Sequence, residues 1–229
     1  MNASDPEMVA REYATSERLE ARRTRVNGWL RGETEAWDEA LAAIAEARPQ
    51  RVLDAGCGDG LFARVIAAPE VIGIDSAPAM VARARERGID ARLGDIQDLP
   101  FDDDEFDVVV CNWTLYHLQD LNSGLREIAR VLRPEGCFVG IYNRKQHMEE
   151  LWSRVRPGFD ASDDYDEPLA RHFTRVETRD TVAYTLWESR DDLQRYLDAY
   201  IEMMGSMVAP DAPYPFKVTR LNRVYVARK

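Results

Sequence analysis

The sequence predicts an α/β fold built on a parallel sheet. Short apolar runs of strand length alternate with helical patterns between residues 50 and 142, which is typical of right-handed βαβ units. The first run leads directly into a glycine-rich turn, and the first two runs each end in an acidic residue. Open α/β sheets bind ligands at the carboxyl edge of their strands, so we expect the functional groups there.

The N-terminal residues 1–46 are expected to be helical. Asp5 can cap a helix that has Pro6 at its first position. A second helix, from about Glu33 to Ala47, carries Trp37 and Ile44 at helical spacing.

The turn after the first strand indicates what kind of ligand the sheet binds. Gly56, Gly58 and Gly60 permit positive φ angles and leave no Cβ where a ligand must approach. A dinucleotide-binding turn would place its third small residue at position 61, but Leu61 stands there and begins the expected next helix. Asp54 would repel a pyrophosphate, whereas it can accept a hydrogen bond from an ammonium group. The turn favours an amino-acid-bearing nucleoside over NAD, and a purely structural glycine turn is the alternative.

The second strand, over residues 71–75, also ends in an acid. Asp75 lies 21 residues after Asp54, where a carboxylate can accept both hydroxyls of a ribose bound across the first turn. Ser76 and Met80 belong to the start of the following helix, and the soft side chain of Met80 can pack on a purine face.

The third and fourth strands are expected over residues 91–93 and 106–111. After the third, Asp95 can accept from an exocyclic amine while the Ile96 backbone N–H donates to a ring nitrogen, which is the pattern of the adenine edge. The fourth is apolar almost throughout, as a central parallel strand should be.

Polar and aromatic residues follow the fourth strand directly, at Asn112, Trp113, Tyr116 and His117. His117 is the candidate general base, because an imidazole titrates near neutral pH; a hydrogen-bonded scaffold histidine is the alternative. Tyr116 and Tyr13 are candidates for orienting a substrate, and His147 is a candidate for lining its pocket or simply facing water.

The rest of the chain shows no internal repeat and no linker, so we expect a single domain over residues 1–229. The expected elements are a helix over 121–132, a turn at 134–136, a strand over 137–142, a helix over 146–155, a strand over 176–186, a helix over 190–203 and a strand over 217–227.

Composition narrows the function classes. The 229 residues hold 41 acids against 30 bases, a net charge of −11, which disfavours a nucleic-acid partner. Three widely spaced cysteines form neither a disulfide framework nor a metal site. No leader sequence or membrane-spanning run is evident, so we expect a cytoplasmic protein without a membrane partner, either monomer or homodimer.

Four linked motifs resemble the type 11 branch of the class I S-adenosylmethionine (SAM) dependent methyltransferases. They are DAGCGDG at 54–60, GDIQDLPF at 94–101, FDVVVCN at 106–112 and LRPEG at 132–136, together with the acid at 75. The resemblance covers residues 50–142, the SAM-binding core. It implies a Rossmann-like, seven-stranded, mostly parallel sheet with helices on both faces and an antiparallel last hairpin. Residues 1–46 would then be a lid over the cofactor, with packing against the sheet as the alternative, and residues 143–229 a variable substrate-side segment.

The resemblance also implies residue roles. Asp54 and the loop glycines would lie near the methionine part of SAM, Asp75 on the ribose, Asp95 with Ile96 on adenine, and Asn112 with Trp113 beside the methyl donor. Ser76 and Met80 are further candidates for binding the cofactor. The function expected is methyl transfer from SAM to an oxygen, nitrogen or carbon of a small metabolite, secondary metabolites included, with S-adenosylhomocysteine (SAH) as product. The alternatives are a non-catalytic SAM-binding protein and an RNA methyltransferase.

Overall fold

One continuous sheet organises the protein. The computed structural model describes residues 4–15, 17, 19, 30–31, 33–160, 162 and 164–229. Within them the strands are β1 Leu30–Arg31, β2 Arg51–Ala55, β3 Glu70–Asp75, β4 Asp90–Leu93, β5 Phe106–Val110, β6 Leu132–Asn143, β7 Arg175–Trp187 and β8 Phe216–Arg228. The helices are α1 Pro6–Glu12, α3 Glu33–Glu46, α4 Pro78–Glu86, α5 Leu121–Val131, α6 Glu149–Val155, α7 Asp166–Ala170, α8 Arg190–Asp198 and α9 Ile201–Met204, with short 3-10 turns η1 Ala63–Val65 and η2 Leu115–His117.

The strand order confirms the expected architecture. It runs β1-β7-β8-β6-β5-β2-β3-β4. Strands β2 to β6 are mutually parallel, and β8 is antiparallel to both β6 and β7. Beside these seven strands, the two-residue β1 pairs antiparallel with β7, inside a region that was expected to be helical.

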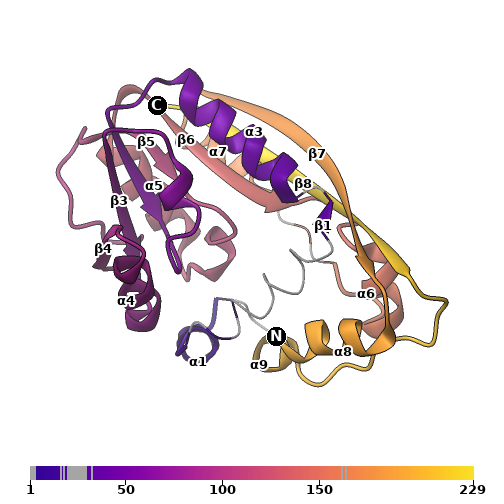
Figure 1. The fold of residues 1–229 in the computed structure, drawn as a ribbon. Coiled ribbons are helices and arrows are strands. Elements are labelled where there is room, and N and C mark those ends of the chain that lie inside the picture. The colour runs from indigo at the N-terminus through magenta and orange to yellow at the C-terminus, as the bar shows by residue number, and fades with distance from the viewer. Residues whose placement is uncertain are drawn as a thin grey trace.

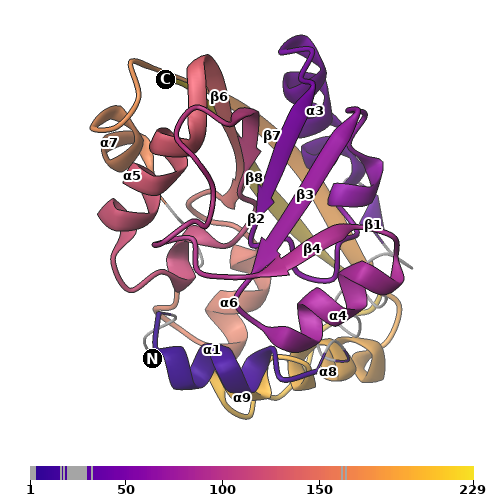
Figure 2. The same cartoon turned by 90° about the vertical axis from the view of Figure 1, so that its left-hand side faces the viewer.

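Helices cover both faces of the sheet because neighbouring strand residues point to opposite sides. Val109 belongs to a core cluster that α5 and α7 complete. Val108 and Val110 belong to the opposite cluster, which α3 completes. Figure 2 shows α5 and α7 on one side of the strands and α3 on the other. This three-layer core holds the carboxyl ends of β2 to β5 in fixed positions.

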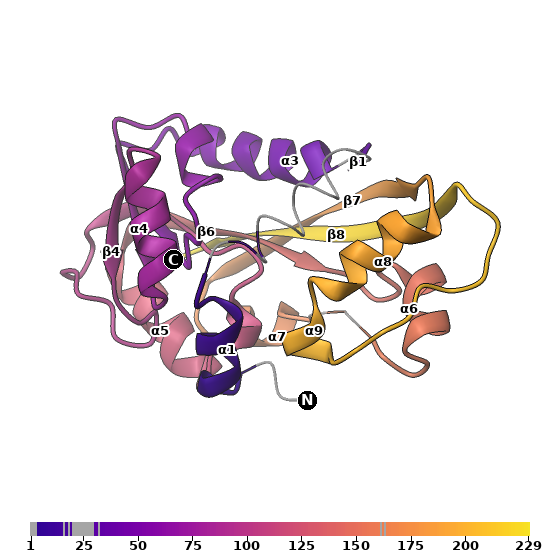
Figure 3. The same cartoon turned by 60° about the horizontal axis from the view of Figure 1, so that its bottom comes forward.

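The last hairpin is much longer than the parallel strands. Strands β7 and β8 stay paired from Arg175 and Arg228 to Trp187 and Phe216, whereas β6 pairs with β8 only as far as Asn143. The distal half of the hairpin therefore continues past the parallel sheet, as Figures 1 and 3 show. There it carries a separate apolar cluster built with α6 and α8.

Three local expectations need correction. The helix expected from Leu61 is only η1, since Pro69 disfavours helical conformation at the preceding residue and the chain must return at once to β3. The expected turn at 134–136 is an irregularity inside β6, where the register with β5 shifts. The helix expected over 190–203 is divided into α8 and α9. None of the described helices has the length and apolar character needed to cross a membrane.

Candidate active site

A cavity of about 1150 Å³ lies at the carboxyl edge of the parallel strands. Its walls come from the ends of β2 to β5, from α1 and from α6, α8 and α9 of the distal region. Figures 2 and 3 show α1 lying beside α9, which it contacts, and both helices line the cavity. Pockets of roughly 300–1,000 Å³ hold one drug-sized ligand, so this cavity has room for two small ligands together.

The glycine turn forms one end of the cavity. The N–H groups of Gly56 and Cys57 both donate to the Ile74 carbonyl oxygen, at 2.8 and 2.9 Å. Gly58 has φ +54°, and a Cβ added there would meet only Leu19 Cδ2, at 3.6 Å. The missing side chain of Gly58 therefore leaves the cavity open above the turn.

Gly56 serves a different purpose in the same turn. It has φ +79°, and an added Cβ would lie 2.4 Å from Thr114 Cγ2. Its lack of a side chain lets the loop after β5 approach the glycine turn closely.

Three carboxylates stand at the ends of neighbouring strands. Asp54 at the end of β2 is buried, Asp75 ends β3 and Asp95 follows β4. Asp75 Oδ2 accepts from Gly58 N–H at 2.8 Å and Oδ1 accepts from Ala77 N–H at 2.9 Å. Burial raises the pKa of Asp75, and these two backbone donors oppose the shift. The carboxylate thus ties the glycine turn to the start of α4.

Hydrogen bonds to β6 hold the loop after β5 in place. Asn112 Oδ1 accepts from Ile141 N–H at 2.9 Å. Trp113 adopts a left-handed φ of +48°, a conformation that concentrates at functional sites in non-glycine residues. Its indole Nε1–H donates to Asn143 Oδ1 at 3.2 Å, which also accepts from Asn222 Nδ2 at 3.1 Å. The indole ring is therefore fixed in the middle of the cavity wall.

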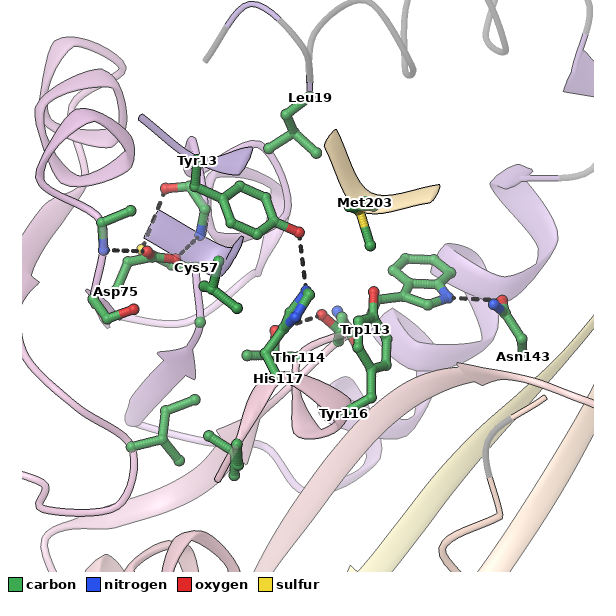
Figure 4. A pocket seen from close by; sticks show the side chains of 18 of the residues that line it. Tyr13, Leu19, Cys57, Asp75, Trp113, Thr114, Tyr116, His117, Asn143 and Met203 are labelled. Carbon is green, nitrogen blue, oxygen red and sulfur yellow. Dashed lines mark hydrogen bonds between the residues drawn. The ribbon is translucent and has the colours of Figure 1, made fainter. Parts of the chain in front are cut away.

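A hydrogen bond joins the N-terminal helix to the loop after β5. The Tyr13 hydroxyl lies 3.0 Å from His117 Nε2, although 104 residues separate them. Their rings meet edge to face, with centroids 5.5 Å apart; Figure 4 shows both side chains pointing toward one another. Asp5 caps α1 by accepting from Glu7 N–H, as expected, and Tyr13 ends that helix over the cavity.

His147 lies on the other side of the cavity. Its Nδ1 is 2.8 Å from the Leu221 carbonyl oxygen, and the ring is buried. Burial lowers the pKa of His147 to about 3, with a further contribution from the positive charge of Arg220. The imidazole is therefore neutral at physiological pH.

Known proteins resemble this chain in the part that carries the glycine turn and the ends of the parallel strands. The profile of a family described as "Methyltransferase domain" matches residues 53–140. The chain is 37% identical over 109 residues to the uncharacterized methyltransferase YcgJ of Bacillus subtilis, with 43% of each chain covered. It is 34% identical over 137 residues to malonyl-[acyl-carrier protein] O-methyltransferase of Halorhodospira halophila, covering 54% of this chain and 46% of that one.

A solved structure extends the likeness to most of the fold. N-methyltransferase NodS from Bradyrhizobium japonicum, in complex with SAH, matches with a TM-score of 0.55 at 17% identity and covers 86% of this chain and 87% of that one. Residues 53–140 thus match the methyltransferase-domain profile, and the chain shares the fold of the solved methyltransferase. The sequence matches span less than half the length of the two curated relatives named above.

The cavity brings together most of the residues expected from the sequence. Those that line it are Tyr13, Asp54, Gly56, Gly58, Asp75, Ser76, Asp95, Ile96, Asn112, Trp113, Tyr116, His117 and His147. The expected residues thus form one continuous surface.

Two expected cofactor residues do not line the cavity. A Cβ on Gly60 would lie 2.9 Å from Ala84 Cβ, so this glycine lets α4 pack against the turn. Met80 is fully buried. The neighbouring Asp59 likewise faces inward and pairs with Arg87 at 2.6 Å. Spacing along the motif did not separate these packing positions from the ones that face the ligand.

Sequence reasoning missed the aromatic wall of the cavity. Trp152, Phe159, Tyr196 and Tyr200 line it together with Met148, just before α6, and with two methionines of α9. Tyr196 lies in α8 and Tyr200 follows two residues after that helix ends; the two are four residues apart, and their hydroxyls lie 3.2 Å from each other. This four-residue spacing was the only sequence signal for the aromatic wall, and residues that are merely buried in a helix have the same spacing.

Proposed function

We propose that this protein transfers the methyl group of SAM to an oxygen, nitrogen or carbon atom of a small-molecule acceptor. The observation that carries the proposal is the two-part cavity: a glycine turn with three carboxylates at one end and an aromatic wall at the other, with Trp113 and His117 also lining it. A methyltransferase must hold a cationic nucleoside and an acceptor at attack distance, and one joined cavity does this.

The residues at the glycine turn fit SAM in chemical type. Asp54 suits the ammonium group, Asp75 the ribose hydroxyls and Asp95 the adenine amine, because ionised carboxylates accept hydrogen bonds and do not donate them. The open face above Gly58 is where a side chain would collide with a ligand on the turn. Three carboxylates would repel the diphosphate of a dinucleotide. When bound, SAM supplies an electrophilic methyl group, so the protein mainly has to orient the acceptor.

The chain's own groups can orient an acceptor and exclude water. Helix α1 lines the cavity and places Tyr13 on His117. Holding two reactants in line contributes much of the rate enhancement in such a displacement. Where the chemistry requires a base, we assign that role to His117, and the Tyr13 hydroxyl at its Nε2 orients the ring.

Calorimetric titration with SAM, SAH and NAD in parallel tests the cofactor class. We expect SAM and SAH to bind with micromolar affinity and NAD not to bind. Binding of NAD without SAM would refute the proposal.

The Tyr13 hydroxyl is expected to hold α1 in its closed position. Replacing Tyr13 with phenylalanine keeps the ring contact but removes the hydrogen bond, which contributes about 0.5–1.5 kcal/mol. Amide hydrogen exchange in α1 of the SAH-bound protein should then become roughly 2–10 times faster. Tyr184, which is exposed on β7, supplies the control substitution Tyr184→Phe. Unchanged exchange in Tyr13→Phe would show that the hydrogen bond does not hold the helix.

A further inference from the structure

The half of the cavity next to the distal part of the β7–β8 hairpin is lined by α6, α8 and α9 and is here called its distal half. The side chains there restrict which acceptor molecules can bind. Among the described residues that line the whole cavity, Arg220 is the single lysine or arginine. Around the distal half stand the aromatic and methionine side chains of α6, α8 and α9. A surface of this kind suits an apolar ligand with one or two polar groups.

The rings of the distal wall meet one another at steep angles. Trp152 meets Phe159 at 5.4 Å between centroids with an interplanar angle of 76°, and meets Tyr200 at 6.1 Å and 87°. Tyr196 and Tyr200 are 5.2 Å apart at 68°. Where these rings line the cavity, their edges and remaining faces can make the same edge-to-face or offset contacts with a planar ring.

The wall is also rigid before any ligand arrives. Trp152 and Tyr196 are almost fully buried and belong to the apolar cluster of the distal hairpin. The Tyr196 hydroxyl lies 3.2 Å from that of Tyr200. A preformed wall loses little conformational entropy when it binds a rigid ligand.

His147 supplies a hydrogen-bond acceptor at this end of the cavity. A neutral imidazole has one N–H and one lone pair. Nδ1 stands 2.8 Å from the Leu221 carbonyl oxygen and 3.2 Å from the Leu221 backbone nitrogen, so it can donate to the first or accept from the second. The shorter contact favours the tautomer with the proton on Nδ1, because two acceptors at 2.8 Å would repel. In that tautomer Nε2 carries the lone pair, and no hydrogen bond to it is found within the described parts of the chain.

We propose that the acceptor is a planar aromatic molecule whose hydroxyl group donates a hydrogen bond to His147 Nε2 while its ring packs on the wall formed by Trp152, Tyr196 and Tyr200. This inference deepens the proposed function and rests on it. The positive charge of Arg220 beside His147 favours an oxygen that carries partial negative charge, as a phenolic oxygen does.

Binding of three probes to the SAH-saturated protein tests the proposal. They are 2-naphthol, which is planar with a hydroxyl group, 2-methoxynaphthalene, which is planar without a donor, and cyclohexanol, which has a hydroxyl group but no flat ring. We expect 2-naphthol to bind about tenfold more tightly than 2-methoxynaphthalene through one added hydrogen bond, and cyclohexanol to bind more weakly still. Equal affinity for the two naphthalenes, or tighter binding of cyclohexanol, would overturn the proposal.

Two variants locate the binding site. In His147→Asn the amide can still donate to the Leu221 carbonyl but has no counterpart of Nε2, so 2-naphthol should lose about tenfold in affinity while 2-methoxynaphthalene is unaffected. Tyr200→Leu should weaken both naphthalenes by about tenfold and leave cyclohexanol unchanged. The control is His172→Asn, because His172 does not line the cavity.

The affinity for SAH distinguishes a failure of the acceptor assignment from a failure of the proposed function. Unchanged SAH binding in the variants shows that they are folded. If SAH binds to the wild-type protein and 2-naphthol does not, the acceptor assignment is wrong while the proposed function stands. If SAH itself does not bind, the proposed function fails, and this inference fails with it.

Discussion

Gly56→Ala is expected to destabilise the protein by about 2–5 kcal/mol. A left-handed backbone costs a residue with a side chain about 1–2 kcal/mol, and overpacking a close contact adds about 1–3 kcal/mol. Both costs apply at Gly56, which has φ +79° and lies so close to Thr114 that an added Cβ would approach Cγ2 to 2.4 Å. Urea unfolding measures the loss of stability, and the variant should also bind SAH poorly because the loop after β5 is displaced.

Gly88 offers a matched control for this substitution. It has φ +86°, but an added Cβ would meet nothing within 4 Å. Gly88→Ala should therefore show only the backbone cost of about 1–2 kcal/mol and bind SAH normally. Equal destabilisation in the two variants would mean that the contact with Thr114 is not what requires glycine at position 56.

Asp75→Asn should weaken SAH binding by about 5- to 150-fold. The change removes the charge that strengthens hydrogen bonds to the ribose, and losses of about 1–3 kcal/mol correspond to this range. It also replaces one carboxylate oxygen with an NH₂ group, which cannot accept from either Gly58 N–H or Ala77 N–H. The glycine turn would therefore lose one of the two bonds that tie it to α4.

Calorimetry with SAH measures this effect, and Asp102→Asn is the control because Asp102 is exposed and does not line the cavity. A folded Asp75→Asn protein with wild-type affinity for SAH would rule out the ribose assignment.

The parts of the fold that could be predicted are those encoded locally. The glycines at 56 and 58, the cap at Asp5 and the acids that end β2 and β3 each follow from a few neighbouring residues, and the structure has the corresponding elements. The turn signal at residues 134–136 was also local, but strand pairing continues on both sides of these residues, so they lie within β6.

The contacts that complete the candidate site could not be predicted in this way. Tyr13 and His117 were both candidates, yet nothing in the sequence pairs residues 104 positions apart. Trp152 and Tyr200 come together only because the distal hairpin brings α6 and the residues between α8 and α9 to the same end of the cavity. Such partners depend on the tertiary arrangement and not on a spacing along the chain.

The extra length of β7 and β8 makes the two ends of the cavity separable units. The profile match ends at residue 140, close to the end of β6 at Asn143, and the distal wall is built almost entirely from the chain beyond that point. A different α6-to-β8 segment could therefore be joined to the same half of the cavity that holds the glycine turn. Under the proposed function, such a chimera would keep SAM as the methyl donor and change the acceptor, provided that the pairing of β6 with β8 is preserved at the junction.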